Sequence, residues 1–281
     1  VLFKLVKSQL LARKIIKDFK PHAAVGVGGY ASGPTLKMAG MMGIPTLIQE
    51  QNSYAGVTNK LLAKKACKIC VAYDGMERFF EKDKIILTGN PVRQGLRNHH
   101  ISREDAIRSF GLDPSKKTIL IVGGSLGART INNCVMEGLD KIKASGAQFI
   151  WQTGKIYIGE ARAAVAQAGE LPMLHVTDFI SDMAAAYSAA DLIISRAGAG
   201  SISEFCLLQK PVILVPSPNV AEDHQTKNAL ALVNKNAALY IKDAAAKEAL
   251  LDKAVETVKQ PETLKSLSTN IAKLAFTDSA N

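Results

Sequence analysis

The sequence is poor in the residues that mark disulfide scaffolds and structural metal sites. It holds 4 cysteines in 281 residues, and only Cys67 and Cys70 have the spacing of a redox or metal pair. No second pair of this kind and no nearby pair of histidines completes a zinc site. We therefore interpret Cys67 and Cys70 as small buried residues, and the low cysteine content fits a reducing compartment.

Long apolar runs and aromatic residues are also scarce. No stretch of about 18 uninterrupted apolar residues occurs, so no segment is predicted to span a membrane. Aromatic residues make up 6% of the chain and do not alternate with basic ones. Because no nucleic-acid-binding motif is present either, we expect no nucleic acid partner.

Basic charge is abundant and unevenly distributed. The net charge is +10, and residues 1–92 hold 14 Lys and Arg against 6 Asp and Glu, which leaves only +2 for residues 93–281. A basic helix with many apolar residues is predicted over 1–20. We expect its apolar face to pack on a sheet. The charge of residues 1–92, by contrast, favours an anionic membrane surface as a partner.

The length and the order of the predicted elements suit two α/β domains. Apolar strands alternate with helical segments throughout, which predicts parallel sheets with helices on both faces. The polar stretch 93–103, which contains Asn98, His99 and His100, is interpreted as a linker. We predict two Rossmann-like domains, residues 1–92 and residues 93–281.

The most informative segment is 190–204. Its residues 192–194 are short, apolar and β-branched, as in a buried parallel strand. Gly198 and Gly200 allow a tight turn, and the helix that follows offers free N–H groups and a dipole to a phosphate. Glu204 lies close enough to accept hydrogen bonds from a sugar diol attached to that phosphate. By itself the pattern is equally that of an ordinary strand–helix turn with a surface glutamate.

A second strand–helix junction follows directly. Residues 210–216 form another buried strand, and residues 222–229 open another helix after a polar loop. Polar junctions at the carboxyl ends of neighbouring strands form the crevice in which open α/β sheets bind nucleotides.

An NAD-binding interpretation of the first glycine loop is the alternative. Gly26-x-Gly28-x-x-Ala31 follows a strand, and Glu50 stands about 20 residues further on, which nearly satisfies the dinucleotide fingerprint. Against it, Pro34 stands just after the loop, and no residues for hydride transfer are visible nearby.

Residues 195–204, followed by Asp223-His224-Gln225, resemble the donor-nucleotide site of the MurG family of GT-B glycosyltransferases. Further stretches match the family in the same order, so the resemblance covers nearly the whole chain. These stretches are residues 26–34, 50–52, 89–93, 123–129, 151–155 and 177–180.

The resemblance implies an inverting transfer of N-acetylglucosamine in peptidoglycan synthesis. The donor is UDP-N-acetylglucosamine, and the acceptor is the 4-hydroxyl of the muramyl sugar of undecaprenyl-pyrophosphoryl-MurNAc-pentapeptide, met on the cytoplasmic face of the plasma membrane. Such a reaction needs a base and stabilisation of the leaving diphosphate. Since no Asp-x-Asp motif is present, we expect no metal and no cofactor. Loops 124–128 and 198–202 would then carry that charge.

The resemblance also implies roles for individual residues. Ile180 would meet uracil through its backbone, and Glu204 would bind the ribose hydroxyls. Arg93 would contact the nucleotide at the cleft. Phosphate or ribose contacts are expected from Ser125, Ala199, Gly200 and Ser201.

Further residues are expected to handle the sugars. Gln225, with His224, would hold the donor sugar, and Asn52 would reach it from the first domain. The acceptor-side loop is expected to consist of Gly28, Gly29, Tyr30, Ser32 and Gly33.

The chain departs from the family pattern at both ends. It starts at Val1 without the family's opening strand and glycine-rich loop, whose histidine is a candidate base, and it stops near the family's final helix. We therefore expect a truncated chain, and the catalytic base stays unassigned. A UDP-sugar-binding fragment without turnover, a GT-B glycolipid synthase and a UDP-N-acetylglucosamine epimerase are the alternatives.

Overall fold

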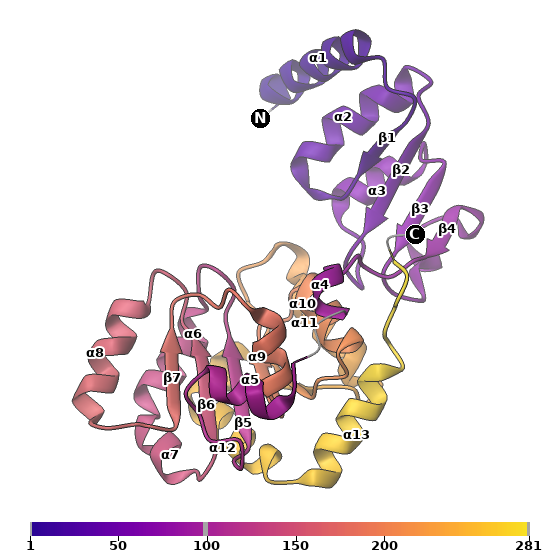
Figure 1. The fold of residues 1–281 in the computed structure, drawn as a ribbon. Helices are drawn as coiled ribbons and strands as arrows, with labels where there is room; N and C mark the ends of the chain where they lie inside the picture. Colours follow the sequence, from indigo (N-terminus) through magenta and orange to yellow (C-terminus); the bar gives the residue numbers. More distant parts are fainter. Residues whose placement is uncertain (1, 98–100, 280–281) are drawn as a thin grey trace. The chain divides into compact units, whose positions relative to one another are not determined.

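The computed structural model describes residues 2–97 and 101–279 and divides into two compact units (Figure 1). Unit 1 comprises Val1–Pro91 and Asp278–Asn281, and unit 2 comprises Val92–Thr277. Asn98, His99 and His100 of the predicted linker lie outside the described residues. Both units are built on parallel sheets, which confirms the predicted α/β class.

Unit 1 contains a four-stranded parallel sheet in the order β1-β2-β3-β4. Ile48 and Ile69, on neighbouring strands, are fully buried in its core beneath Leu36 of the second helix. The elements are α1 (Leu2–Phe19), β1 (Ala24–Gly26), α2 (Gly29–Met41), β2 (Thr46–Glu50), α3 (Val57–Ala63), β3 (Lys68–Val71), the 3-10 turns Met76–Arg78 and Lys82–Lys84, and β4 (Ile85–Leu87).

The expectation that the apolar face of α1 is buried was wrong for most of that face. Among the side chains of α1 that the structure describes, only Ala12 and Ile16 are buried, where they pack with Met38 and Ala39 of α2. Phe3 is 82% exposed and Phe19 is 78% exposed. The reason is that α1 packs on the helix α2 rather than on the sheet, and a single helix covers only a narrow stripe of its neighbour's surface. The other exposed apolar residues of α1 are Leu5, Val6, Leu10, Leu11 and Ile15.

Unit 2 contains a six-stranded parallel sheet in the order β10-β9-β8-β5-β6-β7. Its strands are β5 (Thr118–Val122), β6 (Gln148–Gln152), β7 (Leu174–Thr177), β8 (Leu192–Ser195), β9 (Val212–Leu214) and β10 (Leu239–Tyr240). Its helices are α4 (Gln94–Arg97), α5 (Arg103–Ser109), α6 (Arg129–Glu137), α7 (Leu139–Ala144), α8 (Ile158–Ala168), α9 (Met183–Ala189), α10 (Ala199–Leu207), α11 (His224–Val233), α12 (Ala246–Val258) and α13 (Pro261–Ala272), with 3-10 turns Ala221–Asp223 and Asp243–Ala245.

The central strand β5 is buried at every position because helices cover both of its faces. Ile119 and Ile121 belong to a core cluster that α6 and α12 complete. Since side chains alternate along a strand, Leu120 lies on the opposite face, which α9 covers. Continuous apolar burial of this kind is typical of a parallel sheet covered on both sides.

The order of the strands creates a reversal of direction next to β5. The chain runs outward from β5 through β6 to β7 and then returns to β8, which pairs with the other edge of β5. Val122 is in register with Ser195, so the two strands end side by side. This reversal of direction is the topological switch point at which open α/β sheets bind ligands, outside the carboxyl ends of the strands.

The cysteine interpretation needs one correction: Cys67 is exposed, and Cys70 is only partly buried. Cys67 precedes β3 in the turn that enters the sheet, so its side chain does not reach the core. Cys134 and Cys206 are buried, and burial raises the pKa of the first thiol to about 11 and of the second to about 12.

We expect a thiol reagent at pH 8 to label Cys67 of the native protein first and Cys70 more slowly. Cys134 and Cys206 should react only after unfolding, because their thiols are buried and stay protonated. Counting the thiols that react before and after addition of denaturant, with a Cys67→Ser control, tests this order. Rapid native labelling of Cys206 would contradict it.

Candidate functional site

Two glycine turns lie next to each other at the switch point of unit 2. The loop after β5 leads into α6, and the turn after β8 leads into α10. In the described structure neither helix has a side-chain cap, since Ala128 and Gly198 stand at the two capping positions. Their first N–H groups are therefore left for an external acceptor, and a phosphate is the ligand that helix N-termini of this kind favour.

The loop after β5 is held in a shape that only glycine allows. Gly127 has φ +85° and packs against the loop after β6, where a Cβ atom would stand 2.2 Å from the carbonyl oxygen of Thr153. Its N–H donates to the carbonyl of Gly124 over 3.0 Å. Ser125, in the same loop, is exposed.

Glu204 lies in the second turn of α10 and has two defined partners. Its Oε1 accepts hydrogen bonds from the Arg93 guanidinium, at 3.1 Å from Nη2 and 3.4 Å from Nε. Its Oε2 accepts one from the hydroxyl of Tyr187 at 2.7 Å. The structure thus brings together Glu204 and Arg93, both predicted from the sequence, and adds Tyr187, which was not predicted.

The junction after β9 is fastened to the turn after β8 by Gln225. Its Oε1 accepts hydrogen bonds from the N–H groups of Ala197 at 3.2 Å and Ser217 at 2.9 Å. Helix α11 begins at His224, two residues later than residue 222 where the sequence placed it, because Glu222 and Asp223 adopt left-handed φ angles.

The same segment holds His224 close to an acidic neighbour. The Nε2 atom of His224 lies 3.0 Å from Oε2 of Glu222. Gln225 and His224 therefore stand together beside the glycine turn after β8, where the sequence predicts a sugar contact.

A polar network that the sequence analysis missed ties the loops of this crevice together. Arg196, directly after β8, donates to the carbonyls of Val215 at 3.0 Å and Pro216 at 3.1 Å and pairs with Asp243. Asp243 also accepts a hydrogen bond from Thr130 of α6 at 2.9 Å. Arg196 stood inside the segment singled out from the sequence, but the identity of its partner depends on the fold.

Ile180 lies in the turn between β7 and α9. Its side chain is buried, and the turn is fixed by the hydroxyl of Thr177, which donates to the carbonyl of Phe179 at 3.0 Å. Among the described residues nothing hydrogen-bonds to the N–H or carbonyl of Ile180. The backbone groups of Ile180 therefore have no described partner, and the uracil contact stays a prediction.

The predicted residues of unit 1 gather at the carboxyl ends of β1 and β2. Glu50 is buried and organises the loop after β2: its Oε1 accepts from the N–H of Asn52 at 3.0 Å, and its Oε2 from Gly56 at 3.0 Å and Asn59 at 2.8 Å. The neighbouring loop after β1 opens α2. That loop and the start of α2 hold Gly28, Gly29, Tyr30, Ser32 and Gly33.

Helix α2 begins at Gly29 and runs through Pro34 without a break, so Pro34 lies inside a helix and not just after a loop as predicted. Tyr30 is exposed, which leaves the first turn of α2 accessible to a ligand.

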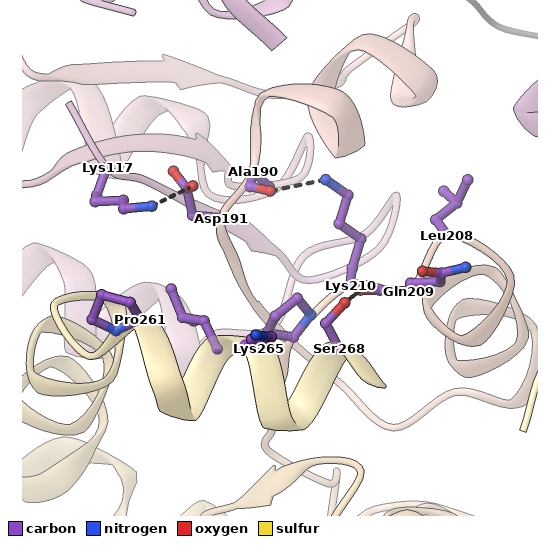
Figure 2. A pocket seen from close by; sticks show the side chains of 11 residues that line it. Lys117, Ala190, Asp191, Leu208, Gln209, Lys210, Pro261, Lys265 and Ser268 are labelled. Carbon is purple, nitrogen blue, oxygen red and sulfur yellow. Dashed lines mark hydrogen bonds and ion pairs between the residues drawn. The ribbon is translucent and has the colours of Figure 1, made fainter. Parts of the chain in front are cut away.

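A pocket of about 410 Å³ lies at the opposite, amino-terminal ends of β5, β8 and β9 (Figure 2). Asp191 is its only carboxylate, and it already pairs with Arg103 at 2.7 Å and Lys117 at 3.1 Å. Lys210 donates to the carbonyl of Ala190 at 3.0 Å, and burial lowers the pKa of its amine. These contacts hold the strand ends together, far from the glycine turns.

Two negative findings concern the described residues alone. They contain no group of three or more His, Cys, Asp and Glu side chains placed to hold a metal ion. Within the same part of the chain, no helix is both long and apolar enough to cross a membrane.

Comparison with known proteins identifies the family of the chain. Residues 118–281 match the glycosyltransferase family 28 C-terminal domain, and residues 1–71 match the glycosyltransferase family 28 N-terminal domain. A Bacteroides fragilis protein named UDP-N-acetylglucosamine–N-acetylmuramyl-(pentapeptide) pyrophosphoryl-undecaprenol N-acetylglucosamine transferase is 72% identical over 100% of this chain and 74% of its own length. Its namesake from Bacteroides thetaiotaomicron is 70% identical over 100% of this chain and 76% of its own length.

Solved structures give the same result. The crystal structure of Acinetobacter baumannii MurG matches with a TM-score of 0.78 and 31% identity, over 99% of this chain and 78% of the other. A Staphylococcus aureus MnaA–UDP structure, 15% identical with a TM-score of 0.69 over 95% of this chain and 75% of the other, shares the fold alone. The chain therefore belongs to the MurG family, within glycosyltransferase family 28.

Proposed function

We propose that this chain transfers N-acetylglucosamine from UDP-N-acetylglucosamine to the 4-hydroxyl of the muramyl sugar of a lipid-linked muramyl-pentapeptide, with inversion at the anomeric carbon. This is the lipid I to lipid II step of peptidoglycan synthesis. The proposal follows the name of the relatives that match the full length of this chain. The observation that carries the donor half is the pair of uncapped helix N-termini at the switch point, with Glu204 beside them.

Each part of the crevice has a task in this reaction. The N-termini of α6 and α10 hold the diphosphate and stabilise the charge that develops on it as the glycosidic bond breaks. Ser125, Ala199, Gly200 and Ser201 line these turns. Ile180 pairs with uracil through its backbone, and the Glu204 carboxylate accepts hydrogen bonds from the ribose diol.

The oxygen and the nitrogen of the Gln225 side-chain amide have different roles. Its Oε1 is occupied by the N–H groups of Ala197 and Ser217, so its Nε2 is the group that donates to the donor sugar, with His224 beside it. In unit 1, Glu50 fixes Asn52, the residue that the family resemblance assigns to the donor sugar. The acceptor loop around Gly28 and Tyr30 receives the lipid-linked muramyl sugar. The base stays unassigned.

Incubation with UDP-N-acetylglucosamine and a lipid-linked muramyl-pentapeptide tests the proposal. Formation of the lipid-linked disaccharide and release of UDP support it. UDP binding without turnover would instead indicate a donor-binding module, and a changed sugar nucleotide in the absence of acceptor would indicate an epimerase. A folded chain that binds no uridine nucleotide would remove the donor site from the proposal.

We further propose that α1 brings the chain to an anionic membrane, peripherally and on the cytoplasmic face of the plasma membrane. The exposed apolar residues of α1 are interspersed with basic ones, and residues 1–92 carry a net charge of +8. A helix with exposed apolar side chains and a basic face binds the interface of anionic bilayers. The basic residues among residues 1–20 are Lys4, Lys7, Arg13, Lys14, Lys17 and Lys20.

Replacing Lys14 and Lys17 by glutamine should weaken binding to vesicles that contain an anionic phospholipid about thirtyfold, since each basic residue near such a surface contributes about 1 kcal/mol. Both side chains are exposed, so the fold should be unaffected. Vesicle co-sedimentation at low and high salt measures the effect. The matched control is Lys143→Gln with Lys265→Gln, which removes the same charge from residues 93–281. Equal losses in both variants would contradict a role for α1.

A further inference from the structure

The Glu204 carboxylate has one buried partner and one exposed partner. Tyr187 of α9 is 3% exposed, and its hydroxyl donates to Oε2 over 2.7 Å. Arg93 meets Oε1, and its side chain is 68% exposed, whereas that of Glu204 is 13% exposed. A ligand that arrives from solvent therefore reaches Oε1, while Oε2 stays in contact with the protein interior.

Tyr187 is well suited to fix the carboxylate. Its ring packs edge-on against Phe205 of α10, with ring centroids 5.9 Å apart and an interplanar angle of 87°. Burial, and then the charge of Glu204, raise the pKa of the Tyr187 hydroxyl, so the hydroxyl stays protonated and donates at neutral pH. The terminal torsion of a glutamate is soft, and a single short hydrogen bond from a rigid donor restricts it strongly.

We propose that Tyr187 is a positioning residue for nucleotide recognition: by holding Oε2 it aims Oε1 of Glu204 at the ribose diol and so sets the preference for ribonucleotides over deoxyribonucleotides. The proposal rests on the donor site proposed above. In the free protein the Arg93 guanidinium occupies Oε1. A diol that binds there replaces Arg93 at an acceptor that is already oriented. The Glu204 carboxylate therefore loses little rotational freedom when the diol binds.

The test is titration of UDP and 2′-deoxy-UDP against the parent chain and Tyr187→Phe. The substitution removes one hydroxyl and keeps the ring that packs on Phe205. We expect UDP binding to weaken about tenfold, because the hydrogen bond from the Tyr187 hydroxyl that orients the charged Glu204 carboxylate is lost. Binding of 2′-deoxy-UDP should change less than about twofold, so the ratio of the two affinities falls. A purely structural role of Tyr187 would weaken both ligands by the same factor.

Three further variants make the outcome decisive. Tyr240→Phe removes a tyrosine hydroxyl in β10 and should leave both affinities unchanged. Phe205→Leu loosens the same packing but keeps the hydroxyl, and it should lower the ratio of the two affinities less than Tyr187→Phe does. In a Glu204→Gln background, Tyr187→Phe should no longer change the ratio, because the carboxylate through which it acts is gone.

Several results would overturn the inference. The inference fails if Tyr187→Phe leaves the ratio of the two affinities unchanged. It also fails if Tyr187→Phe still changes that ratio in the Glu204→Gln background. If the parent binds UDP and Glu204→Gln weakens that binding while Tyr187→Phe changes nothing, the inference fails and the donor site stands. If the folded parent binds neither nucleotide, the donor site and the inference fail together.

Discussion

Replacing Glu204 by alanine is expected to weaken UDP binding about ten- to a hundredfold. The variant loses a charged acceptor, and a hydrogen bond to a charged group contributes about 1.5–3 kcal/mol. Glu204 lies in the second turn of the helix whose N-terminus is proposed to hold the diphosphate, so we expect it to reach the ribose of the same ligand. Calorimetric titration of UDP and of UDP-N-acetylglucosamine measures the loss, which should be similar for both because both carry the same ribose.

The Glu204→Ala variant also needs a measurement of stability. Without the carboxylate the buried hydroxyl of Tyr187 has lost its acceptor, which costs about 1–3 kcal/mol of folding free energy. Denaturant unfolding of the free variant gives this cost separately from the loss in binding. Glu262→Ala, in the first turn of α13, removes an exposed carboxylate elsewhere in unit 2 and is the matched control. Equal UDP affinity in the two variants would contradict the role of Glu204.

Much of the donor crevice follows from local patterns in the sequence. The apolar runs 118–122 and 192–194 become β5 and β8, and the glycines after them form turns into helices. These are local effects of burial, backbone freedom and helix capping, which a short segment determines by itself. The polar positions at the strand ends could therefore be named before the fold was known.

What the sequence did not reveal depends on pairs of residues that are far apart in the chain. Tyr187 is one hydroxyl in an alanine-rich helix, and only the packing of α9 on α10 brings it to Glu204. Arg196 and Asp243 are 47 residues apart, and neither residue type indicates the other. The exposure of α1 was missed for a similar reason, since a periodic apolar face shows that burial is possible and does not identify the surface that covers it.

The largest effect on the crevice as a whole is expected from Gly127→Ala. A Cβ atom at this position would stand 2.2 Å from the carbonyl oxygen of Thr153 and 2.7 Å from the ring of Tyr157, so the loops after β5 and β6 must move apart. The backbone also has φ +85°, which costs a residue with a side chain about 1–3 kcal/mol. Overpacking costs about another 1–3 kcal/mol. We therefore expect both a large loss of stability and a large loss of UDP binding.

Two other glycines separate these contributions. Gly124 has φ +81° but nothing within 4 Å of its added Cβ, so Gly124→Ala should lose only the backbone share of the stability. Gly159 lies inside α8 with open space around it, and Gly159→Ala should leave stability unchanged or raise it by about 0.5–1 kcal/mol. Denaturant unfolding with parallel UDP titration should rank Gly127→Ala as the most damaged variant and Gly159→Ala as the least. If Gly127→Ala were as stable as Gly124→Ala, contact between the loops after β5 and β6 would not determine the shape of the loop after β5.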